Sequence, residues 1–165
     1  MTRRRVILVS SVYLLGLVVV TTIVHEVGHF IAALVMGIPL NEIDIGLYGI
    51  NPSVTIPERF ASSNLSIFYY AGGLTTAGIL IIVYLIFWYR KYKREPSLIN
   101  WLMGLITITI AGFHLAQGYN EGRFHAAYIY YSQTLFNPLT IIICLSVIVF
   151  ILLHFLICPR SKIQR

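Results

Sequence analysis

The chain has 165 residues, of which 58% are hydrophobic and only 11% are charged. With a mean hydropathy of +0.80, this composition excludes a water-soluble enzyme or binding module. The net charge of +6 does not indicate nucleic-acid binding, because the lysines and arginines gather in short clusters beside apolar stretches. We expect a single membrane domain over residues 1–165, in contact with the lipid bilayer and with no nucleic-acid partner.

Four apolar stretches are long enough to cross a bilayer, which takes about 20 residues as a helix. They cover residues 6–37, 64–89, 98–119 and 138–158. The first is too long and too uncharged for a cleaved signal peptide, so we expect it to be retained. The prediction is an all-α polytopic membrane protein with about four transmembrane helices.

Basic clusters at residues 2–5, 90–94 and 159–165 lie at the ends of these stretches. Four spans place all three clusters on one side of the membrane, and the positive-inside rule makes that side the cytoplasm. We therefore expect a multi-pass cell-membrane protein with both termini in the cytoplasm. Two longer connections, at residues 38–63 and 120–137, lie on the other side.

The first of these connections contains "NEIDIGLYG" and "SVTIP", in which polar and apolar residues alternate. This alternation predicts a small β-hairpin after the first helix. Gly37 and Pro39 precede it and are typical of the end of a helix.

The first apolar stretch contains the sequence HEVGH at residues 25–29. His25 and His29 are four residues apart, so both imidazoles project from one helix face and can bind one metal ion. Glu26 lies close to that face, and zinc hydrolases with this spacing use the glutamate to take a proton from a metal-bound water. Gly28 leaves space beside the metal face for another backbone. Ionisable groups within a spanning helix are costly and usually functional, although a metal-free hydrogen-bond cluster is the alternative.

HEVGH on an early transmembrane helix resembles the site-2 protease family of intramembrane zinc metalloproteases. The segment Ala71-Gly72-Gly73-Leu74 is similar to an alanine-glycine-proline-like element of that family, with Gly73 in place of proline. The predicted hairpin also looks like the family's membrane-associated β segment, which is thought to receive an extended substrate. The resemblance implies Zn²⁺ as cofactor, His25 and His29 as zinc ligands, and Glu26 as general base and then acid.

The family's third zinc ligand is an aspartate in an Asp-Gly element, and here the chain departs from the pattern. Its only aspartate, Asp44, lies in the predicted hairpin. Glu121, followed by a glycine, stands in the matching region, and glutamate serves as a ligand in the His₂Glu zinc sites of other metalloproteases. We predict Glu121 as the third ligand, with His114, His125 or the absence of a third protein ligand as alternatives. In a purely structural interpretation, Glu121 would be exposed at the interface and paired with Arg123.

Two further polar residues precede Glu121. His114 lies on a long apolar stretch and either orients a ligand or the water, or packs between helices. Asn120 is a candidate for holding the substrate backbone or the developing oxyanion, as asparagines near this element do in the family.

The depth of the motif raises a conflict. Counted from residue 6, His25 lies roughly 28 Å along the first helix, toward the non-cytoplasmic leaflet if that helix starts at the cytoplasmic surface. Members of the family are described with the site nearer the cytoplasm. The charge rule and the resemblance therefore disagree about the side that the site faces.

We expect a hydrolase, an intramembrane zinc metalloprotease that cleaves a peptide bond in or near a transmembrane segment of a substrate protein. The alternative is a non-catalytic metalloprotease-like membrane subunit that supports a larger membrane complex, as the missing Asp-Gly element would suggest. A zinc or proton transporter fits less well, because the polar residues gather at one end of the predicted bundle.

Overall fold

The computed structural model describes residues 2–48, 51–60, 65–124 and 138–159. Along the chain, the elements are α1 (Arg3–Val35), η1 (Leu40–Glu42), β1 (Asp44–Tyr48), β2 (Asn51–Thr55), η2 (Glu58–Phe60), α2 (Leu65–Val83), the π-helical η3 (Tyr84–Tyr89), α3 (Arg90–Arg94), α4 (Leu98–Phe124) and α5 (Pro138–Ile157).

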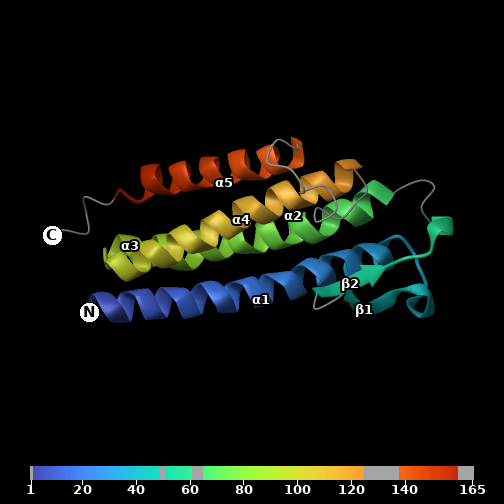
Figure 1. Cartoon of the computed structure of the whole chain (residues 1–165), viewed down its shortest axis with the longest axis horizontal. Coiled ribbons are helices and arrows are strands. Elements are labelled where there is room, and N and C mark those ends of the chain that lie inside the picture. Colours follow the sequence, from blue (N-terminus) through green and yellow to red (C-terminus); the bar gives the residue numbers. More distant parts are fainter. Residues whose placement is uncertain (1, 49–50, 61–64, 125–137, 160–165) are drawn as a thin grey trace.

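Four helical segments are long and apolar enough to cross a membrane, namely Arg3–Val35, Ile67–Arg94, Leu98–Arg123 and Thr140–Ile157. They alternate in direction, so the N-terminus, α3 and the C-terminal end of α5 lie at one end of the bundle and the hairpin at the other (Figure 1). This arrangement confirms the predicted all-α membrane fold with four spans and one small hairpin.

The central helix of the bundle is α4. Half of its most apolar 18-residue window is buried inside the protein, compared with 11% for α1 and for α5. The helices α1 and α5 therefore present most of their apolar side chains to the surroundings, which in a bilayer are lipid chains.

The first helix ends at Val35, two residues before Gly37. Gly37 has a φ of +79°, a conformation that costs glycine little and other residues much more. Its N–H donates to the carbonyl of Leu34 at 2.9 Å, and the N–H of Ile38 donates to the carbonyl of Ala33 at 3.1 Å. This pair of bonds is the Schellman cap, which turns the chain out of the helix toward the hairpin.

The hairpin is antiparallel, with Ile45 of β1 opposite Val54 of β2. Buried Ile43 and Val54 share a core cluster with Ala32 and Ala33 of α1. The hairpin therefore lies against the C-terminal half of α1 (Figure 1).

Two of the predicted boundaries were wrong. Residues 90–94, expected to connect two spans, continue the second helix to Arg94. That helix stops because Pro96 disfavours the helical conformation at Glu95, whose φ and ψ are −133° and 80°. The third helix continues to Phe124 instead of ending near residue 119, so Glu121 is helical and not part of a connection.

Glycines allow the helices to approach closely at one level of the bundle. A Cβ on Gly118 of α4 would lie 2.9 Å from the Cα of Gly73 in α2. A Cβ on Gly28 of α1 would lie 2.8 Å from the carbonyl oxygen of Ala71, also in α2. Because real Cβ atoms do not approach so closely, only glycine fits, as is common where membrane helices pack. One turn of α2 thus brings α1 and α4 together.

A polar network holds the basic end of the bundle. The hydroxyl of Tyr84 is hydrogen-bonded to Nδ1 of His154 at 3.0 Å, and Nε1 of Trp101 donates to the carbonyl of Cys158 at 2.9 Å. His154 is therefore an interhelical contact between η3 and α5. His154 does not belong to the cluster of His25, His29 and Glu121.

Candidate metal centre

Three buried side chains meet where α1 and α4 approach each other: His25, His29 and Glu121. The Nε2 atoms of the two histidines are 3.0 Å apart. Oε2 of Glu121 lies 3.1 Å from Nε2 of His25 and 3.6 Å from Nε2 of His29. Within the described ranges, no other three histidine, cysteine, aspartate or glutamate side chains bring their ligand atoms this close together. The group could hold a metal ion.

The donor atoms fit a cation. Nδ1 of His29 is 2.8 Å from the carbonyl oxygen of Phe68, which can only accept, so Nδ1 carries the proton and Nε2 of the neutral ring offers a lone pair. That lone pair and the carboxylate of Glu121 are buried and face each other. A cation between them would stabilise this arrangement of two electron-rich groups. Atoms bound tetrahedrally at about 2.0–2.1 Å from a metal are about 3.3 Å apart. The observed separations of 3.0 to 3.6 Å lie on both sides of this value.

Glu121 is held by a residue of its own helix. Nε2 of Gln117 donates to Oε1 of Glu121 at 2.9 Å, one helical turn away. Oε2 is left to face the histidines. The interpretation of Glu121 as an exposed residue paired with Arg123 is wrong, because only 6% of Glu121 is exposed and its carboxylate lies at the histidines.

The backbone of α2 forms one wall of the group. A Cβ on Gly72 would lie 2.7 Å from Nε2 of His25 and would also overlap the ring of His29. On the neighbouring turn of α1, Gly28 leaves room for this backbone, which confirms the prediction from the HEVGH motif. A Cβ on Gly28 would lie 2.9 Å from the Cα of Gly72. Gly72 therefore lines the candidate centre, and its neighbour Ala71 contacts α1 beside it.

Glu26 lies on α1 next to the first histidine and reaches the hairpin. Its Oε2 accepts a hydrogen bond from the backbone N–H of Val54 at 3.0 Å. Because this N–H donates to Glu26, and successive N–H groups of a strand alternate between its two edges, it marks the edge of β2 that faces away from β1. The open edge of the hairpin is thus hydrogen-bonded to Glu26, the residue next to His25 of the candidate metal centre.

The remaining predicted residues have different outcomes. His114 packs against His25, with ring centroids 5.6 Å apart, but it is not among the three side chains whose ligand atoms meet. Asn120 is 1% exposed on α4, and its role toward a substrate stays a prediction. His125 lies outside the described residues.

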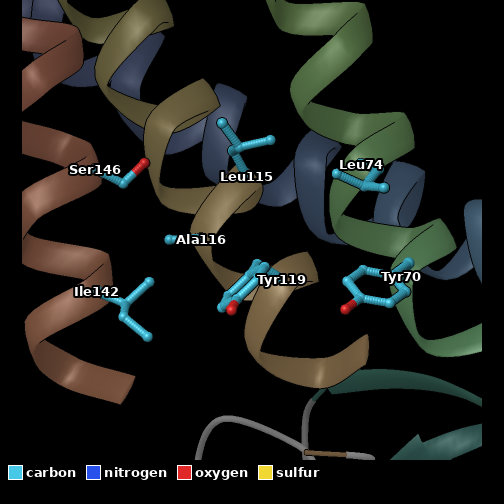
Figure 2. Close-up of a pocket in the computed structure, with 7 residues that line it drawn as sticks. All are labelled: Tyr70, Leu74, Leu115, Ala116, Tyr119, Ile142 and Ser146. Atoms are coloured by element: carbon cyan, nitrogen blue, oxygen red, sulfur yellow. The ribbon is translucent and has the colours of Figure 1, made fainter. Parts of the chain in front are cut away.

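An apolar groove on the surface of the bundle is separate from this centre. It has a volume of about 460 Å³ and is lined by Tyr70, Leu74, Leu115, Ala116, Tyr119, Ile142 and Ser146, from α2, α4 and α5 (Figure 2). At 100° per residue, the α4 residues of the groove lie on roughly the opposite face from positions 114, 117 and 121. Because the two faces of α4 are opposite, the groove does not lead to the candidate metal centre.

Three contacts of the site were not predicted from the sequence. The spacing of four between Gln117 and Glu121 was a visible signal. No sequence signal could reveal the backbone carbonyl of Phe68 or the N–H of Val54, because every residue carries such groups.

Comparisons with protein-family models, with curated proteins and with solved structures found no match to this chain. The functional interpretation therefore rests on the residues of the chain itself and on their arrangement.

Proposed function

We propose that the protein is an intramembrane zinc metalloprotease that hydrolyses a peptide bond in or near a transmembrane segment of a substrate protein. The observation that carries this proposal is the meeting of the two HEVGH histidines with a carboxylate from another spanning helix. The resemblance of HEVGH to the site-2 protease family supports zinc as the metal, with Glu121 in place of the family's aspartate.

In this proposal, His25, His29 and Glu121 would hold a zinc ion. Zinc bound to such a set acts as a Lewis acid that makes water a nucleophile near neutral pH. The carboxylate of Glu26 takes a proton from the attacking water and later gives it to the leaving amine. Oε2 of Glu26 accepts a hydrogen bond from the backbone N–H of Val54. This bond can orient the carboxylate, so that Oε1 accepts and releases the proton.

The hairpin suggests the form of the substrate. A peptide bond inside an intact helix is shielded by the surrounding helix, so a transmembrane substrate must unwind locally before it is cut. The open edge of β2 lies beside Glu26, where an extended segment can form backbone hydrogen bonds. Water and substrate would then enter at the hairpin end of the bundle.

The first test is the zinc content of the detergent-purified protein, measured by elemental mass spectrometry. We expect about one zinc per chain in the wild type, loss in His25→Ala and a reduced content in Glu121→Ala. Absence of zinc from the wild type, after zinc has been offered, would overturn the proposal.

The second test measures cleavage of fluorogenic peptides that carry an apolar segment of about 20 residues. Glu26→Gln should abolish cleavage and leave the zinc content unchanged, because Glu26 is not a ligand. Glu42→Gln is the matched control, since Glu42 pairs with Arg59 outside the metal group.

The alternative function is a non-catalytic subunit of a larger membrane complex. The bond between Glu26 and Val54 favours it in one respect, because Glu26 then has a structural use in attaching the hairpin. A wild type that binds zinc, cleaves none of the peptides and is recovered from native membranes in a complex with other proteins would support this function over proteolysis.

A further inference from the structure

His114 faces the metal group from the same side of α4 as Glu121. Positions 114, 117 and 121 follow the i, i+3, i+7 spacing, which places their side chains on one helix face. The ring of His114 is tilted by 40° against that of His25, with 5.6 Å between centroids, and His114 is 6% exposed. The ligand set is already complete without His114, so its position beside His25 needs another explanation.

One nitrogen on each of these two rings lacks a hydrogen bond. Nδ1 of His25 and Nδ1 of His114 are both buried, and neither has a partner within the described part of the chain. In contrast, Nδ1 of His29 is bound to the Phe68 carbonyl. A metal-binding histidine almost always donates its second N–H to a partner, which fixes the tautomer and the direction of the ring. His25 therefore needs such a partner, and His114 packs against it.

Ring packing alone does not account for a histidine at this position. A leucine or phenylalanine would fill the same space without burying a polar nitrogen, and a buried polar group without a hydrogen bond is destabilising. Two buried nitrogens on adjacent rings, one able to donate and one able to accept, can be satisfied together by one water molecule. Buried waters commonly bridge such groups.

We propose that His114 is the positioning residue of His25. Nδ1–H of His25 donates to a bridging water, and that water donates to Nδ1 of His114. The pair holds the His25 ring with Nε2 directed at the metal, as the Phe68 carbonyl does for His29. The inference rests on the metal centre of the proposed function, but it does not depend on proteolysis.

The test compares two substitutions of nearly equal shape. His114→Gln keeps a hydrogen-bond acceptor at this position, whereas His114→Met fills a similar volume without a good one. Zinc affinity is measured by competition with a chelator on the detergent-purified protein after its metal has been removed. We expect His114→Met to bind zinc about 10- to 100-fold more weakly than the wild type, as is typical when a partner of a ligand is lost. His114→Gln should recover most of the affinity.

His154→Phe is the matched control. It also removes a buried histidine from a spanning helix, but His154 is bonded to Tyr84 and takes no part in the group around His25. Its zinc affinity should equal that of the wild type.

A second readout is the visible absorption spectrum of the Co²⁺-loaded protein, which reports the geometry of the ligands. The spectrum should change in His114→Met and return toward the wild type in His114→Gln. Equal zinc affinities and equal spectra of the two variants would overturn the role of His114, whether both match the wild type or both are weakened. A wild type that binds no zinc would instead overturn the metal centre itself, and the proposed function with it.

Discussion

Two side chains of the candidate metal centre use one atom for the centre and another for a protein partner. Glu121 directs Oε2 at the histidines and receives the amide of Gln117 on Oε1. His29 directs Nε2 inward and binds the carbonyl of Phe68 with Nδ1. Because these partners hold the side chains in place, little conformational freedom remains to be lost when an ion binds.

At the residue scale, Gly72→Ala tests the wall formed by α2. The added methyl group would overlap the histidine nitrogens, so we expect zinc affinity to fall by at least about tenfold, comparable to the loss of a ligand's partner. Gly78→Ala is the control, because its Cβ would have no neighbour within 4 Å. Equal zinc affinity in the two variants, measured by chelator competition, would show that Gly72 is not part of the site.

At the scale of secondary-structure elements, the centre depends on how α1, α2, α4 and the hairpin are placed against one another. Close contacts at Gly28 and Gly73 bring α1 and α4 to the same turn of α2. The Schellman cap at Gly37 then returns the chain so that β2 lies along α1. The hairpin thereby reaches Glu26, although Val54 and Glu26 are 28 positions apart in the sequence.

Gly73→Ala tests the contact between α2 and α4. Its Cβ would overlap the backbone around Gly118, and overpacking of this kind typically costs about 1–3 kcal/mol. We expect a lower midpoint of thermal unfolding in detergent. Gly16→Ala, which has open space around it, should unfold at the wild-type temperature or slightly above, because alanine favours the helix more than glycine does. An unchanged midpoint in Gly73→Ala would contradict the close packing.

Val54→Pro tests the link between the hairpin and Glu26. Proline removes the N–H that donates to Glu26, and proline is tolerated on the open edge of a strand. In the proposed protease, we expect cleavage to slow by about tenfold or more, corresponding to about 1.4 kcal/mol, with the zinc content unchanged. Val54→Ala keeps the N–H and serves as the control. If the proline variant cleaves at the same rate as the alanine variant, this bond does not orient the carboxylate.

At the scale of the whole molecule, the candidate metal centre connects a helix on the outside of the bundle to its central helix. The helix α1 carries two of the three candidate ligands and is mostly exposed, whereas α4 carries the third and is central. An ion at this position would therefore act as a cross-link between the two helices.

Removal of the metal should lower the stability of the fold. Free zinc at 100 times its dissociation constant stabilises a protein by about 2.7 kcal/mol if the unfolded chain does not bind it. We expect the zinc-loaded wild type to unfold at a higher temperature in detergent than the chelated protein, and His25→Ala to show no such difference. An equal shift in His25→Ala would mean that zinc stabilises the protein at some other place.

The arrangement of the helices also predicts a topology. The N-terminus and the basic segment around α3 lie at the same end of the bundle (Figure 1), and the positive-inside rule assigns that end to the cytoplasm. Thr2→Cys, in a variant whose two native cysteines are replaced by serine, should react with a membrane-impermeant maleimide only after cells are permeabilised. Labelling of intact cells would show the opposite orientation, with the N-terminus outside the cell and the candidate metal centre nearer the cytoplasm.

Several features could be predicted because they depend on residues close in the sequence. The spans follow from the length of apolar runs, the hairpin from alternation, and the pairing of His25 with His29 from the period of a helix. Glu121 was predicted from a resemblance, but its helical state was not. The polar residues around it suggested a connection, whereas their burial against α1 and the bond from Gln117 keep them in the helix.

Residues close in the chain are enough to identify four apolar spans and a histidine pair with a glutamate on the first of them. The meeting of Glu121 with that pair, the backbone that borders it and the N–H that binds Glu26 depend on how the helices pack. Apolar length and helical period are local, but the offset between two packed helices depends on where their small residues let them approach. In this chain, the contacts at Gly28, Gly73 and Gly118 set that offset, and they bring Glu121 to His25 and His29.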